Sequence, residues 1–255
     1  MNINLYPLID LLAVPLFNGL DTDPITILAG FLVSALPCMI FVVVAGLIVF
    51  AIYYNYRREK QRTADLQRVA EEMGFEFLPR DDNALLSELG GFDLFSRGRS
   101  RRVFNLLRGT IRRQPVSVFD YSYVTGSGKH RHTWRHSVAC FQLDGASLPA
   151  FSLRPEGIFA KIGGMFGYQD IDFTHNPTFS KQYLLRGQDE SAIRVLFRDD
   201  VLDFYAAQPG LSTEVNGNYL VFYRHASRVE PPAIRSFIEE GLRVLGFFQP
   251  AHDDF

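Results

Sequence analysis

The stretch ILAGFLVSALPCMIFVVVAGLIVF, residues 27–50, decides the architecture of this chain. From Pro24 to Tyr56 the sequence contains no Asp, Glu, Lys or Arg. About 20 consecutive apolar residues are enough to cross the hydrocarbon core of a bilayer, whereas an amphipathic helix on a small domain carries a polar face. The sequence therefore predicts one transmembrane helix over residues 25–54, with a soluble domain after it.

The charges that flank this helix predict its direction. All 26 Lys and Arg residues of the chain follow it, whereas Asp21 and Asp23 precede it. The membrane-flanking basic residues, which lie in a juxtamembrane segment over residues 55–62, are Arg57, Arg58, Lys60 and Arg62. Because Lys and Arg near a span favour the cytoplasm, we expect a single-pass protein of the bacterial inner (plasma) membrane with its N-terminus outside.

Residues 1–24 are apolar but too short for a second span, so we expect an outside or interfacial segment there. The chain lacks the basic start of a signal peptide. Within the span, Gly30, Ser34 and Cys38 form a stripe of small residues. Such a stripe permits close helix contact and suggests a homo-oligomer through the span. Cys140 is the second cysteine, so no disulfide scaffold is expected.

Residues 63–255 predict a cytoplasmic domain of the α+β class, with antiparallel hairpins and flanking helices. Val116–Val124 and the segment from His130 to Leu143 are rich in strand-forming residues, and a Gly-containing turn separates them. Asn216-Gly217 predicts a second hairpin. A final helix starts at Pro231-Pro232, because apolar residues recur after it at helical spacing. These hairpins occur without regular strand–helix alternation, which is typical of α+β folds.

Residues 97–135 hold ten Lys or Arg residues against the single acid Asp120, a net charge of +9 in a chain whose net charge is −2. Together with Arg108, the basic residues are Arg97, Arg99, Arg101, Arg102, Arg112, Arg113, Lys129, Arg131 and Arg135. Three interpretations are open: contact with anionic lipid headgroups, binding of nucleic acid or another phosphate ligand, or a solvated face neutralised by acids of the same fold. An acidic protein partner would use the same residues. The membrane tether favours lipid and makes nucleic acid a poor candidate.

His130, His132 and His136 share strand parity with Trp134, which places them on one face of a regular strand. A His-x-His pair can chelate a metal, but Lys129, Arg131 and Arg135 surround it with positive charge. A pH-sensitive surface is an equal alternative. The sequence therefore assigns no metal site to these residues, and no role for them is fixed.

No catalytic or cofactor motif stands out, so the sequence predicts no catalytic residue and no cofactor. Gly126–Lys129 lacks the spacing of a phosphate-binding loop and has His130 where that motif needs Ser or Thr. A binding or scaffold protein is therefore favoured. A membrane-tethered enzyme is the alternative.

With the anchor and the basic run, the segments Phe95–Gly98, Phe119–Tyr123 and Gly126–Lys129 give a pattern that resembles bacterial membrane-anchored proteins of unassigned function. The resemblance covers most of the chain after the span. It implies the same anchored architecture and supplies no functional residues.

Overall fold

The computed structural model describes residues 24–80, 84–143, 148–156 and 170–249. The chain forms two compact units, Met1–Arg58 and Glu59–Phe255. The predicted α+β class is confirmed, because the second unit combines an antiparallel sheet with flanking helices. The segment predicted outside the membrane, residues 1–24, lies outside the described residues up to residue 23, so Asp21 and Asp23 are not described.

Helix α1 (Pro24–Met73) runs through the predicted span and the juxtamembrane segment without a break. The sequence predicts boundaries between the span, the segment over residues 55–62 and the domain that starts at Thr63. Between Gly46 and Gly74 there is no Gly or Pro, and the basic run consists mostly of good helix formers. The helix therefore continues to Gly74, whose φ of +69° ends it. The second unit begins earlier than expected, at Glu59.

In the first unit, α1 is a candidate membrane span. Of the described helices, it is the one long and apolar enough to cross a bilayer. Its large apolar side chains are exposed, as at Phe41, which is 74% exposed. Exposed apolar surface of this extent marks a site of protein–protein or membrane contact. In the predicted oligomer stripe, Cys38 is exposed, whereas the exposure of Gly30 and Ser34 is not described.

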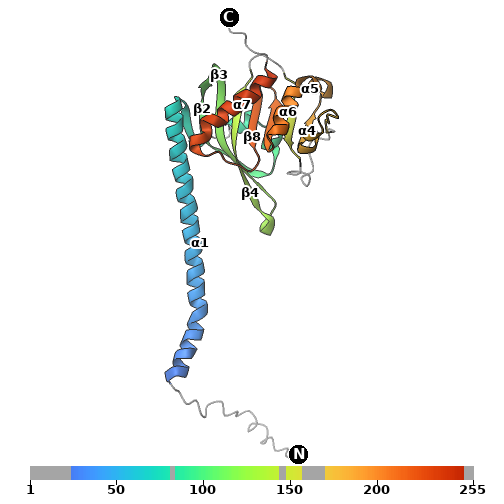
Figure 1. Ribbon diagram of the computed structural model, residues 1–255. Coiled ribbons are helices and arrows are strands. Elements are labelled where there is room, and N and C mark those ends of the chain that lie inside the picture. The colour runs from blue at the N-terminus through green and yellow to red at the C-terminus, as the bar shows by residue number, and fades with distance from the viewer. Residues whose placement is uncertain (1–23, 81–83, 144–147, 157–169, 250–255) are drawn as a thin grey trace, which may run out of the picture. The chain divides into compact units, whose positions relative to one another are not determined.

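The second unit is built on an antiparallel sheet whose strand order is β1-β2-β3-β4-β8-β7-β5-β6 in the described part of the chain (Figure 1). The strands are β1 (Glu76–Arg80), β2 (Arg99–Ile111), β3 (Gln114–Thr125), β4 (His132–Gln142), β5 (Phe151–Pro155), β6 (Tyr183–Gly187), β7 (Leu211–Asn216) and β8 (Tyr219–Arg224). The helices that follow α1 are α2 (Ala84–Glu88), α3 (Asp93–Ser96), α4 (Pro177–Gln182), α5 (Glu190–Leu196), α6 (Asp199–Ala207) and α7 (Ile234–Phe248), with short 3₁₀ turns η1 (Gly128–His130) and η2 (Pro231–Ala233).

Both predicted hairpins are present. Strands β3 and β4 pair as far as Thr125 and His132, and their tip projects from the sheet in Figure 1. Strands β7 and β8 are joined at Asn216-Gly217, where a φ of +57° at Gly217 suits a tight turn. The predicted C-terminal helix is α7.

Alternating side chains give the sheet two apolar faces. On β3, Val118 belongs to the larger cluster, which includes Leu66 of α1 and Phe237 of α7, whereas the adjacent Phe119 belongs to a second cluster with Leu94 of α3. The helices α4 to α6 join the larger cluster. The sheet is therefore covered on one face by α1 and the later helices, and over part of the other face by α2 and α3.

Strand β1 forms one outer edge of the sheet and pairs only with β2 among the described strands. It is short, and Pro79 within it has no backbone N–H to donate.

Helix α7 packs closely enough on the sheet to require glycine at one position. A Cβ atom added at Gly241 would lie 2.6 Å from the Phe141 ring, whereas one at Gly246 of the same helix would meet nothing within 4 Å. We expect Gly241→Ala to lower the free energy of unfolding by about 1–3 kcal/mol through overpacking. The matched variant Gly246→Ala should be neutral or stabilising by up to about 1 kcal/mol, since Ala favours a helix over Gly. Urea unfolding of both variants tests this, and equal effects at the two positions would contradict the packing.

Candidate functional site

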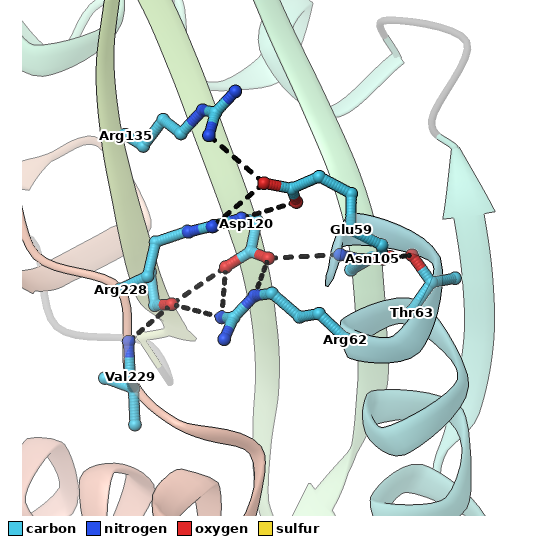
Figure 2. A network of polar contacts seen from close by, with 9 residues as sticks. Glu59, Arg62, Thr63, Asn105, Asp120, Arg135, Arg228 and Val229 are labelled. Carbon is cyan, nitrogen blue, oxygen red and sulfur yellow. Dashed lines mark hydrogen bonds and ion pairs between the residues drawn. The ribbon is translucent and has the colours of Figure 1, made fainter. Parts of the chain in front are cut away.

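A buried ion pair joins the C-terminal part of α1 to the middle of β3. The Arg62 guanidinium donates from Nε and Nη2 to the two carboxylate oxygens of Asp120, each at 2.8 Å (Figure 2). The Arg62 side chain is 9% exposed and that of Asp120 is 2% exposed. Asn105 Nδ2 donates to the same carboxylate at 3.0 Å, and Ser137 Oγ donates to it at 2.8 Å. A buried charge is tolerated when it is paired and fully hydrogen-bonded in this way.

Arg62 was predicted to flank the membrane, and the structure places it inside the second unit instead. Its partner lies 58 residues away in the sequence. Of the other membrane-flanking residues, Arg57, Arg58 and Lys60 are exposed.

One turn before Arg62, Glu59 forms a second ion pair. It accepts hydrogen bonds from Arg228 Nη1 at 2.7 Å and Nη2 at 3.0 Å, and from Arg135 Nη1 at 3.1 Å. Burial would raise the pKa of Glu59, but the Arg228 guanidinium, Arg135 and Arg62 outweigh it, so the pKa lies below its usual value. Ser137 Oγ also accepts the Val229 N–H at 3.0 Å. The network thus joins α1, β3, β4 and the segment after β8 (Figure 2).

The structure divides the predicted basic zone into groups. Arg102 and Arg135 are both register partners of Ser122, so they lie on one face at the hairpin end of β2, β3 and β4. We call five exposed basic residues at this end the hairpin-end group: Arg99, Arg102, Lys129, Arg131 and Arg135. Arg108, Arg112 and Arg113 lie at the opposite end of β2, near the β2–β3 turn.

Two members of the predicted zone are held by local contacts. Arg97, whose side chain is 10% exposed, contacts Asp93 Oδ2 at 2.6 Å. Arg101 Nη1 donates to the Phe95 carbonyl at 2.5 Å. At the opposite end, Arg112 pairs with Glu239 of α7 at 2.9 Å. Arg97 is therefore mostly buried and paired. Arg101 and Arg112 are bonded within the fold but remain exposed, as does Arg135 of the hairpin-end group, which pairs with Glu59.

The predicted histidine row is present in part. His132, Trp134 and His136 alternate along β4, whereas His130 lies in η1. His136 is fully buried, and its ring lies parallel to that of Tyr123, with centroids 5.7 Å apart and an interplanar angle of 4°. Burial lowers the pKa of His136 to about 4. In the described residues, no group of three or more His, Cys, Asp or Glu side chains is arranged to hold a metal ion.

The second face of the sheet contains a feature that the sequence analysis missed. A cavity of about 250 Å³ lies between strands β5 to β7 and the loop before α3. Arg186, Ser152 and Glu214 line it and form one row across β6, β5 and β7, since Ser152 is the register partner of both others. Arg154 lies two positions along β5 from Ser152 and contacts Asp93 Oδ2 at 2.5 Å.

Glu214 is 1% exposed and fully hydrogen-bonded. Its Oε1 accepts the Tyr223 hydroxyl at 2.8 Å, and its Oε2 accepts the backbone N–H groups of Asp93 and Leu94 at 2.8 and 3.3 Å. Burial, followed by the nearby Asp93 charge, raises the pKa of Glu214 from 4.5 to about 7. A charged residue within the otherwise uncharged segment Leu211–Val215 was the available sequence signal.

Comparison with known proteins adds one solved structure. No protein-family model matches the chain, and no curated protein matches it. The crystal structure of the mycobacterial trehalose monomycolate transport factor A matches with a TM-score of 0.53 and 12% sequence identity, over 74% of this chain and 97% of that chain. At this identity the similarity shows a shared α+β fold.

Removing Asp120 should expose the cost of the buried ion pair. Asp120→Ala leaves the Arg62 guanidinium buried without its carboxylate, so we expect the free energy of unfolding to fall by about 3–5 kcal/mol. Urea unfolding of the full chain in detergent micelles measures it. Glu190→Ala is the control, because it removes an exposed pair with Arg194 and should cost less than about 1 kcal/mol. Similar losses in both variants would refute the structural role of Asp120.

The raised pKa of Glu214 predicts a pH dependence of stability. Between pH 4.5 and about 7 the folded chain holds a proton that the unfolded chain has lost. The contribution of Glu214 to stability is therefore full below pH 4.5 and declines as pH rises to 7, by at most about 1.4 kcal/mol per pH unit. We expect the stability of the native chain relative to Glu214→Gln to fall over this range.

Urea midpoints of both proteins at several pH values provide the measurement. Burial lowers the pKa of His136 and His225 to about 4, which gives the opposite slope. Both histidines are present in both proteins, so their contribution largely cancels in the difference. A difference that stays constant from pH 4.5 to 7 would contradict the assignment.

Proposed function

We propose that this chain is a single-pass binding protein of the bacterial inner membrane, with its C-terminal unit in the cytoplasm and its hairpin-end group in contact with anionic lipid headgroups. The observation that carries the proposal is the Glu59–Arg135 contact at 3.1 Å. Because Glu59 is the first residue of the second unit, this contact places Arg135 of the hairpin-end group beside the start of that unit.

The course of α1 inside the second unit supports this. Glu59 contacts Arg135 near the hairpin end, whereas Phe75, just after the helix, packs over Gly109 near the opposite end of β2. The chain therefore leaves the second unit toward the span at the hairpin end. Tyr54, the last residue of the predicted span, precedes Glu59 by five positions, about 8 Å of α-helix. The connection between the predicted span and the start of the second unit is therefore short.

Charge and exposure support a lipid partner. Each Lys or Arg near an anionic surface contributes about 1 kcal/mol of attraction, and the hairpin-end group is exposed. Trp134, half-buried on β4, donates from Nε1 to Thr125 Oγ1 at 2.8 Å near the hairpin tip. Tryptophan side chains favour the membrane interface. An acidic protein partner would use the same surface and is an outcome of the test below.

The solved neighbour is named as a transport factor for trehalose monomycolate. Its shared fold is compatible with a noncatalytic membrane role for this chain, and we take no substrate from it. A membrane-tethered enzyme is the second candidate, and the cavity beside Glu214 is the observation that favours it.

Trp134 is the only tryptophan of the chain, so its fluorescence reports on the hairpin end alone. We expect nitroxide-labelled headgroups to quench Trp134 of the full chain more strongly in nanodiscs with anionic lipid than in zwitterionic nanodiscs. The excess should shrink as salt rises, because salt screens surface charge. Lys129→Gln/Arg131→Gln should remove at least half of it.

Arg108→Gln/Arg113→Gln is the matched control, because it removes the same charge from exposed positions at the other end of β2. It should retain the excess quenching. Equal quenching in both lipids, or equal losses in the two double variants, would reject the lipid contact. Quenching that instead falls when a soluble acidic peptide is added would indicate an acidic protein partner.

A further inference from the structure

The cavity on the second face of β5, β6 and β7 is built as a binding site on a rigid element. Its row Arg186–Ser152–Glu214 consists of register partners on adjacent strands, so the three side chains project from the same face. Apolar lining comes from Phe92, which belongs to the cluster on this face. A concave site with apolar walls and a few convergent polar groups is the usual form of a small-ligand pocket.

The acids of this cavity are already satisfied by the protein. Both carboxylate oxygens of Glu214 accept hydrogen bonds from Tyr223 and the start of α3. Asp93 Oδ2 is shared by Arg97 and Arg154. With both carboxylates ionised, the three arginines Arg97, Arg154 and Arg186 still leave a net charge of +1. Protonation of Glu214 makes the site more positive.

Two residues that line this cavity carry buried donors without partners. Arg186 Nε and Ser152 Oγ are inaccessible to solvent and have no hydrogen-bond partner among the described residues. Buried donors without partners are uncommon, and each one calls for an explanation such as a bound group. Both atoms can donate, and one belongs to a guanidinium, whose fork matches the oxygens of a carboxylate or a phosphate.

We propose that this cavity binds the oxyanion group of a small molecule, a carboxylate or a phosphate monoester, through Arg186 and Ser152 with Arg154 adding positive charge. The apolar walls accommodate a short organic body beside that group. This site is separate from the hairpin-end group, and it rests on none of the lipid-facing residues.

Calorimetric titration of the full chain in zwitterionic nanodiscs tests the proposal. The probes are inorganic phosphate, glycerol 3-phosphate and acetate, each against chloride at constant ionic strength. We expect saturable binding of at least one probe with a Kd on the order of 1 mM or tighter. Arg186→Gln should weaken that binding at least tenfold. Arg186→Lys should give a Kd between those of the native chain and Arg186→Gln, since lysine keeps the charge but lacks the two parallel donors of a guanidinium.

Ser152→Ala removes one donor with little change of volume and should weaken binding by a smaller factor. Arg198→Gln is the matched control, because Arg198 is an exposed arginine next to α6 outside the cavity lining, and it should leave the Kd within about twofold. The thermal midpoint of each variant, compared with that of the native chain, separates lost binding from lost folding.

Nanodiscs that contain phosphatidic acid distinguish the two sources of a phosphate ligand. If the natural ligand is a lipid headgroup, phosphatidic acid should block the phosphate titration, and Arg186→Gln should abolish the block. If the ligand is a soluble molecule, the titration should be unchanged. Absence of saturable binding of all three probes, or binding that survives Arg186→Gln in a folded variant, would overturn the proposal. Trp134 quenching should be unaffected by Arg186→Gln, so this test and the lipid test fail independently.

Discussion

The ion pair between Arg62 and Asp120 is the constraint on which the rest of the second unit depends. It fixes the last turns of α1 against the centre of β3, and the desolvation of both charges is offset by hydrogen bonds from Asn105 and Ser137. Once Arg62 is fixed, Glu59 lies one turn earlier on the same helix and reaches Arg135 and Arg228. The polar network therefore fixes the start of the second unit, at Glu59, to the hairpin end of the sheet.

Register pairing between adjacent strands builds two different polar surfaces on this one sheet. At the hairpin end, Arg102, Ser122 and Arg135 are register partners across β2, β3 and β4. Across β6, β5 and β7, Arg186, Ser152 and Glu214 are register partners in the same way. In the first row the cations are exposed, whereas the second row lines a cavity and includes a buried acid. Exposure, rather than residue type, is therefore the main difference between the two rows.

Local patterns predicted the elements that depend on neighbouring residues. The apolar stretch of α1, the β3–β4 hairpin, the Asn216-Gly217 turn and α7 could all be inferred because each rests on composition, turn chemistry or periodicity. The ion-pair partners of individual charged side chains could not be inferred from such local patterns. Arg62 lies in a basic run and suggested a membrane flank, yet its carboxylate is 58 residues away on β3. The cavity joins β5, β6, β7 and the loop before α3, so it depended on pairings that one sequence does not reveal.

The outer strand β1 has a consequence for self-association. An open sheet edge presents unpaired backbone groups that a second chain can use to extend the sheet, which leads to edge-to-edge aggregation. At Pro79 that edge lacks a donor, and the charged Glu76 and Arg80 stand at its ends. A strand this short and interrupted is a poor template for amyloid-like stacking. Where copies of the chain are crowded together, the β1 edge is therefore a poor site for one sheet to add to another.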